Sequence, residues 1–225
     1  MRPMESTIDL HTNSTGSGPA VVYTHGWIDT SVAWDGVVDA MNDVATNTVW
    51  DLRGHGQSEV PPPGEYTRDH ALADLGRVVD EAGAPVILAG HSLGGYLSLA
   101  HALLHPEQVR GLVLVAAGPG FRKDEAREQW NASVDASAAK FEVPEGSEVI
   151  SKHTDAWVID NLEEIEAPTL VIVGEHDKRF AASAAVFEKY LDVRSSVVIP
   201  DAGHSVHKKH GQPVAKAIKD FLADL

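Results

Sequence analysis

Short apolar runs alternate with amphipathic segments along most of the chain. The apolar runs cover 20–24, 46–52, 84–89, 112–116, 169–173 and 196–199. Between them, apolar residues recur at helical spacing in 31–41, 66–82, 96–104, 181–191 and 213–222. Runs of this length are typical of strands buried on both faces of a parallel sheet. The alternation predicts an α/β fold, a mostly parallel sheet of about seven strands with helices on both faces.

Individual residues indicate where some of these elements begin and end. Ser6–Thr12 can form an edge strand, and 16–19 (Gly-Ser-Gly-Pro) then turns the chain into the next strand. Thr67 is a possible cap for the helix over 66–82, and Pro106 stops the helix that ends near Leu104.

The alternation is interrupted between residues 121 and 160. This stretch is polar and alanine-rich and contains no strong strand pattern. We expect one or two amphipathic helices there, with a loop at Pro144-Glu145-Gly146. The chain is then one domain over 1–225, with 121–160 as an insertion.

Composition narrows the class of protein. A chain of 225 residues with 43% hydrophobic residues can build one globular domain with a substantial core. The lack of cysteine excludes disulfides and thiolate metal sites. Because no signal peptide or membrane-spanning run is recognisable, we expect a cytoplasmic protein without membrane contact.

Charge excludes a further group of partners. The 33 acidic residues outnumber the 18 basic ones, and the net charge of −15 repels nucleic acid. We interpret the excess as a solubility feature and expect no nucleic-acid partner. The pattern carries no signal for an oligomeric state.

A candidate nucleophile lies between a predicted strand and a predicted helix. The stretch 90–95 reads Gly-His-Ser-Leu-Gly-Gly, which contains Gly-x-Ser-x-Gly. At a strand-to-helix junction this motif forms a sharp turn that exposes the serine hydroxyl. Ser92 is therefore the candidate nucleophile, the alternative being a small residue in an ordinary turn. His91 is expected to be a packed or hydrogen-bonded neighbour.

Two later loops offer the general base and the acid that a serine nucleophile needs. Asp177 follows the strand that ends at Val173, and His204 follows the strand that ends at Ile199. The order Ser92, Asp177, His204 is the order of nucleophile, acid and base in this architecture.

Other residues compete for these roles. Glu175 and Asp201 are alternatives to Asp177, and His207 and His210 are alternatives to His204. The spacing of the three histidines also resembles a set of metal ligands, but no nearby carboxylate completes it. We expect neither a metal nor another cofactor.

Candidate oxyanion donors and pocket residues complete the site. The backbone N–H of Leu93 follows the nucleophile, and that of Trp27 lies in the loop His25-Gly26-Trp27 after a strand. The Trp27 ring either lines the substrate pocket or covers the core. Trp130 and Trp157, in the insertion, are further candidates for contact with the substrate.

Taken together, these motifs resemble the α/β-hydrolase superfamily, in its branch of compact esterases and lactonases. The resemblance rests on 25–27, 51–58, 90–95, 174–177 and 202–204. It implies that Ser92 is the nucleophile, His204 the base and Asp177 the orienting acid, and that 51–58 is structural. It also implies a short helical cap over 121–160, smaller than is common in the family, and an abbreviated N-terminal hairpin.

The predicted function is that of a serine hydrolase that cleaves a small carboxylic ester or lactone through an acyl-enzyme intermediate. The same triad also supports C–C bond hydrolysis or peracid formation, which remain alternatives. A ligand-sensing protein that keeps the triad but turns over little is an alternative of another class.

Overall fold

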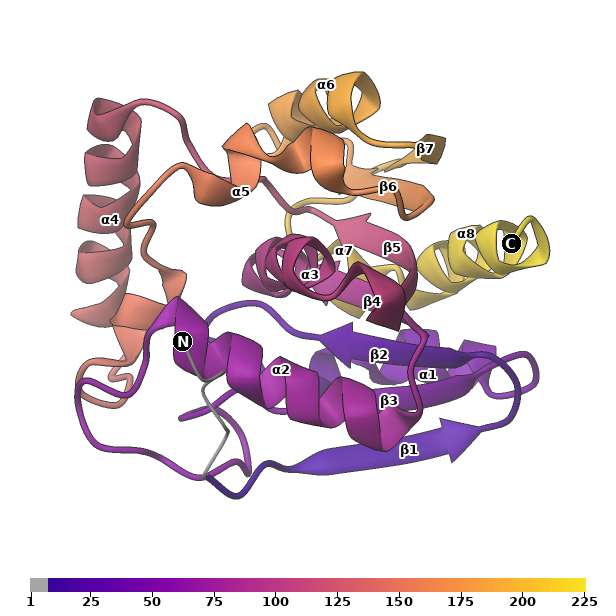
Figure 1. The fold of residues 1–225 in the computed structure, drawn as a ribbon, viewed down its shortest axis with the longest axis horizontal. Coiled ribbons are helices and arrows are strands. Elements are labelled where there is room, and N and C mark those ends of the chain that lie inside the picture. Colours follow the sequence, from indigo (N-terminus) through magenta and orange to yellow (C-terminus); the bar gives the residue numbers. More distant parts are fainter. Residues whose placement is uncertain (1–7) are drawn as a thin grey trace.

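A single seven-stranded sheet forms the centre of the computed structural model, which describes residues 8–225 (Figure 1). The strand order is β1-β3-β2-β4-β5-β6-β7, and all neighbouring pairs are parallel except β1 with β3. The strands are β1 (Thr12–Gly16), β2 (Ala20–Thr24), β3 (Thr46–Trp50), β4 (Val86–His91), β5 (Val109–Val115), β6 (Thr169–Gly174) and β7 (Val193–Ile199). The predicted mostly parallel sheet is confirmed.

The first strand lies later in the chain than the sequence predicted. β1 begins at Thr12, residues 8–11 are not in a strand, and residues 6 and 7 lie outside the described part. Ile8 attracted the prediction because it is apolar, but it is buried in the core outside the sheet. The polar segment Thr12–Gly16 is held instead by backbone pairing with β3, in the register Thr12↔Trp50. An edge strand with exposed side chains lacks the apolar pattern by which a strand is recognised in a sequence.

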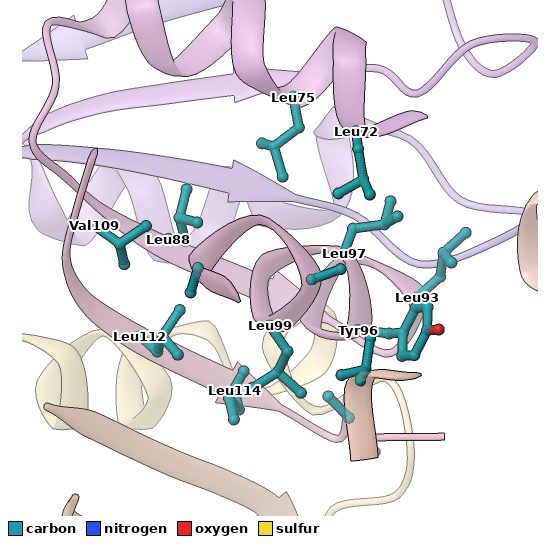
Figure 2. Packing of buried hydrophobic residues seen from close by; sticks show 14 of the residues in the cluster. Leu72, Leu75, Leu88, Leu93, Tyr96, Leu97, Leu99, Val109, Leu112 and Leu114 are labelled. Carbon is teal, nitrogen blue, oxygen red and sulfur yellow. The ribbon is translucent and has the colours of Figure 1, made fainter. Parts of the chain in front are cut away.

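One face of the sheet is covered by α2 (Arg68–Ala82), α3 (Leu93–Leu104), α5 (Trp157–Asp160) and α6 (Ala181–Tyr190). Figure 2 shows Leu72 and Leu75 of α2 packed toward Leu88 of β4 and Leu97 of α3. The hydroxyl of Thr67 accepts a hydrogen bond from the N–H of His70, which confirms the predicted helix cap.

The other face is covered by α1 (Asp35–Met41), α7 (Val206–Lys209) and α8 (Gly211–Ala223). The helix predicted over 31–41 divides into a 3-10 turn at Ser31–Trp34 followed by α1. Further 3-10 turns lie at Pro106–Gln108, Ser147–Ser151 and Leu162–Glu164. Helices on both faces, as predicted, leave the carboxyl ends of the parallel strands free to carry a site.

The insertion between β5 and β6 contains α4 (Asp124–Ala138) and the short α5. α4 stands away from the sheet at one side of the molecule (Figure 1), and Val134 is its one buried residue. Polar contacts hold the insertion together and join it to the main body. Asn131 hydrogen-bonds the backbone N–H and C=O of His153, and Arg68 of α2 forms a bidentate ion pair with Asp155. No helix in residues 8–225 has the length and apolarity needed to span a membrane.

Candidate active site

Ser92 occupies a sharp turn between β4 and α3. Its backbone is held at φ 51°, ψ −112°, an uncommon conformation for a residue other than glycine, and its N–H donates to the Val115 carbonyl at 3.0 Å. The motif's glycines are required by close approach: a Cβ on Gly90 would lie 2.3 Å from the Gly94 carbonyl carbon, and one on Gly94 2.2 Å from the Thr24 oxygen. This is the geometry of a nucleophile elbow.

The predicted acid and base are brought together by β6 and β7. His204 Nδ1 lies 2.8 Å from Asp177 Oδ2, and the Asp177 side chain is 3% exposed. The two loops form one bonded unit, because the N–H of Glu175 donates to the Ile199 carbonyl and that of His176 to the Ala202 carbonyl. A buried carboxylate on Nδ1 fixes the orientation of the imidazole and leaves Nε2 for proton transfer.

The competing residues lie elsewhere. Glu175 accepts a hydrogen bond from the backbone N–H of Asp201, and these two form an exposed cluster with His176. His207 is buried in the core rather than beside Ser92. Within residues 8–225 the three histidines 204, 207 and 210 do not form a group of converging ligand atoms.

His204 is held between rings. Phe180 stacks on it with centroids 4.8 Å apart and an interplanar angle of 17°, and the side chain remains 41% exposed. The Ser92 hydroxyl has no hydrogen-bond partner among the described residues, so its bond to His204 is not formed here. Hydrogen bonds of this kind often close only when substrate is bound.

Of the two expected oxyanion donors, the Trp27 N–H lies in the loop after β2 and the Leu93 N–H at the start of α3. Residue 27 follows Gly26 in the loop, and Ile28 has φ 61°, so the loop turns sharply. The N–H of Leu93 lies in the first turn of α3, where the helix dipole favours negative charge. Neither the Trp27 nor the Leu93 N–H forms a backbone hydrogen bond within residues 8–225.

The segment 51–58, expected to be structural, anchors this loop. His25 Nε2 accepts from the Leu52 N–H and its Nδ1 donates to the Gly26 carbonyl, which defines a neutral imidazole. His55 Nε2 accepts from the Ile28 N–H. Burial lowers the pKa of His25 to about 4, so the ring keeps this form at neutral pH.

A second pair of imidazoles, His91 and His207, lies on one side of His204, the predicted base. His91 Nε2 donates to the backbone carbonyl of His204 at 3.0 Å, and its ring centroid lies 4.7 Å from that of His204 and 4.1 Å from that of His207. Burial lowers the pKa of His91 well below 6.5 and that of His207 to about 3. His91 is thus a hydrogen-bonded neighbour, as expected, whereas the role of His207 in the core had no signal in the sequence.

Two cavities meet at Ser92. One, of about 310 Å³, is enclosed by residues of α3, α4, the loop after β5 and the start of α6; the other, of about 230 Å³, contains His204 and Trp27. Trp130 lines both. Trp157, the other candidate in the insertion, lines neither cavity, and the Arg68 guanidinium lies over its ring, 5.2 Å from the centroid. The sequence around a tryptophan in an insertion does not indicate which way its ring faces.

Several residues that line the larger cavity had not been predicted from the sequence, among them Arg179, Phe180 and His153. Arg179 and Phe180 lie two and three residues after Asp177, so their place near the predicted acid could have indicated a position at the site. His153 contacts Tyr96 edge-on, with centroids 4.5 Å apart, but no motif surrounds it.

The fold agrees with that of known proteins. The family model of the α/β-hydrolase fold matches residues 19–142, more than half of the chain, and the protein belongs to this family. It is 26% identical to 2-(acetamidomethylene)succinate hydrolase of Mesorhizobium japonicum, over 96% of this chain and 92% of that protein.

Two further similarities involve esterases. Pimeloyl-[acyl-carrier protein] methyl ester esterase of Nitrosomonas europaea is 38% identical, over 50% of this chain and 42% of its own. The structure of a thermophilic esterase from Thermogutta terrifontis, with malate bound, superimposes with a TM-score of 0.84 at 25% identity, covering 96% of this chain and 94% of the other. The protein is therefore an enzyme of the hydrolase class.

Proposed function

We propose that the protein is a serine hydrolase that cleaves a small carboxylic ester or lactone through an acyl-enzyme intermediate. The observation that carries the proposal is the Asp177–His204 contact of 2.8 Å beside the same cavity that contains Ser92 at the elbow. The likeness to two esterases supports an ester over other hydrolase substrates.

The proposed reaction begins with Ser92. Its Oγ attacks the substrate carbonyl carbon while His204 Nε2 takes the hydroxyl proton. The backbone N–H groups of Trp27 and Leu93 hold the oxyanion of the tetrahedral intermediate, and Asp177 stabilises the imidazolium. When the intermediate collapses, the ester C–O bond breaks and His204 returns the proton to the leaving alcohol oxygen.

The second half of the reaction uses water in place of the serine. His204 Nε2 takes a proton from water, whose oxygen attacks the acyl carbon, and the Ser92 Oγ–acyl bond then breaks. The proton returns to Ser92 and the carboxylic acid leaves. This sequence uses no cofactor or metal, and the pocket contacts would come from Trp27 and Trp130.

The proposal extends to the domain organisation, location and partner of the enzyme. We infer one domain over 1–225 with 121–160 as its reduced cap, a cytoplasmic location and a small-molecule partner. The short cap agrees with cavities that suit a small to medium acyl or alcohol group.

The test combines turnover with covalent labelling. Nitrophenyl esters of increasing acyl length and a fluorophosphonate probe are given to the wild type, to Ser92→Ala and to Ser196→Ala, an exposed serine on β7. We expect labelling at Ser92 and a loss of at least about 10⁴-fold in kcat for Ser92→Ala alone. A wild type that neither hydrolyses any ester nor takes up the probe would contradict the proposal; probe uptake without turnover would favour a sensing protein.

A further inference from the structure

The charge around the larger cavity is opposite to that of the protein as a whole. The chain has 33 acidic and 18 basic residues, yet none of the described residues that line this cavity is Asp or Glu. Two cations line it, Lys152 and Arg179. In the smaller cavity the one lining acid, Asp29, is paired with Lys208 at 3.0 Å. An electropositive pocket in an acidic protein indicates an anionic ligand.

The two cations are not equivalent. Lys152 Nζ lies 2.6 Å from Asp135 and 3.9 Å from Glu148, so its charge is neutralised within the protein. Arg179 forms no ion pair with any residue of 8–225; its guanidinium lies over the Trp130 ring, 5.1 Å from the centroid. Stacking on an aromatic face leaves the in-plane N–H donors of a guanidinium available for a carboxylate.

A second donor lies one helical turn away. Ser183, in the first turn of α6, is half-buried and lines the same cavity, and its hydroxyl has no hydrogen-bond partner among the described residues. The first turn of α6 contains no acidic residue. Arg179, which is exposed, and Ser183 therefore both line the volume that Ser92 also lines, and neither donor group is paired within residues 8–225.

We propose that this volume is a carboxylate subsite, with Arg179 as the specificity-determining residue and Ser183 as its second donor. The substrate would be an ester that also carries an ionised carboxylate, such as the half-ester of a dicarboxylic acid. Phe121, Trp130 and Phe180, which line the same cavity, would contact its carbon chain. The choice of an ester rests on the proposed function; the binding of the carboxylate does not.

Binding is tested without turnover, in the Ser92→Ala background. Calorimetric titration compares half-esters of linear dicarboxylic acids with the ester carboxamides of the same shape, which lack the charge. Arg179→Gln is compared with Lys178→Gln, which removes the same charge from the adjacent exposed residue outside both cavities. We expect Arg179→Gln to weaken half-ester binding about tenfold and to leave carboxamide binding within about twofold, with Lys178→Gln within about twofold for both.

Kinetics separate binding from a structural role. In the enzyme with Ser92 intact, Arg179→Gln should raise KM for half-esters with little change in kcat, and should leave neutral esters unaffected. A merely structural role would lower activity on both kinds of ester. Added salt should lower kcat/KM for half-esters more than for neutral esters.

The outcomes distinguish the two proposals. Equal binding of half-ester and carboxamide, no half-ester binding, or equal effects of the two variants would each overturn the carboxylate subsite, even if Ser92 labels and turns over neutral esters. Half-ester binding that depends on Arg179, in a protein that neither labels nor hydrolyses esters, would support the subsite and refute the esterase.

Discussion

His207 is expected to make the stability of the protein depend on pH. Its side chain is fully buried beneath His91 and against Trp34, with ring centroids 4.1 and 4.5 Å away, and neither ring nitrogen has a hydrogen-bond partner among the described residues. Burial, with smaller contributions from His204 and Lys208, lowers its pKa from the ordinary 6.5 to about 3. The folded protein therefore holds this imidazole neutral where the unfolded chain would protonate it.

The direction and size of the pH effect on stability follow from the difference between the pKa of His207 in the folded and in the unfolded state. Between pH 3 and 6.5 the unfolded state binds more protons, so stability falls as the pH falls through that window. Between pH 7 and pH 5 this one group removes about 2 kcal/mol of stability. Such a loss is a large fraction of the free energy of unfolding of a typical domain, which is roughly 5–15 kcal/mol.

Urea unfolding of the wild type and of His207→Leu, followed by tryptophan fluorescence at pH 5, 6 and 7, measures the effect. Leucine changes the packing, but that change is common to all three pH values and cancels in the difference. The wild type should lose about 2 kcal/mol more than His207→Leu between pH 7 and pH 5. Val206→Ala, at the neighbouring buried position, removes no titrating group and should lose as much as the wild type. Parallel curves for the wild type and His207→Leu would refute the reasoning.

Three further outcomes are expected. Asp177→Asn should lower kcat about 10⁴-fold while circular dichroism stays unchanged, because the base loses its orienting carboxylate; near-normal kcat would exclude Asp177 as the acid. Gly26→Ala would place a Cβ 2.7 Å from His91 Nδ1 and displace the loop His25-Gly26-Trp27, which carries a proposed oxyanion donor. We therefore expect kcat to fall about 10²–10³-fold, and unchanged ester kinetics would contradict this prediction. Arg53→Met removes the bidentate ion pair between Arg53 and the buried Asp74 carboxylate and should cost about 3–5 kcal/mol in urea unfolding; a loss under about 1 kcal/mol would contradict the assigned importance of this buried pair.

Much of the architecture was predictable because its signals are local. The runs at 20–24 and 169–173 became strands because each is apolar on both faces, and Thr67 capped α2 through a hydrogen bond three residues away. The elbow and the Asp177–His204 contact followed from motif order, since parallel strands deliver their carboxyl ends to one edge of the sheet.

The remainder depends on contacts between distant segments. β1 is a strand because β3 pairs with it, and its own side chains do not show this. Trp130 and Trp157 both lie in the insertion, yet of the two only Trp130 lines the cavities, because the path of the insertion decides which way each ring faces. Whether Arg179 is paired likewise depends on where the acidic side chains lie in the fold, and the residues next to it in the sequence do not show this.

Under the proposed mechanism, the position of β7 at the edge of the sheet links turnover to strand alignment. Its side chains are mostly exposed, so an apolar pattern does little to fix its pairing with β6. A slip of one residue would move the loop that carries His204 by about 3.3 Å, enough to break a 2.8 Å contact with Asp177. Loop hydrogen bonds such as that of the Glu175 N–H oppose the slip. A population misaligned at this edge would retain its circular dichroism and lose its catalysis, so specific activity reports the fraction of molecules in native register.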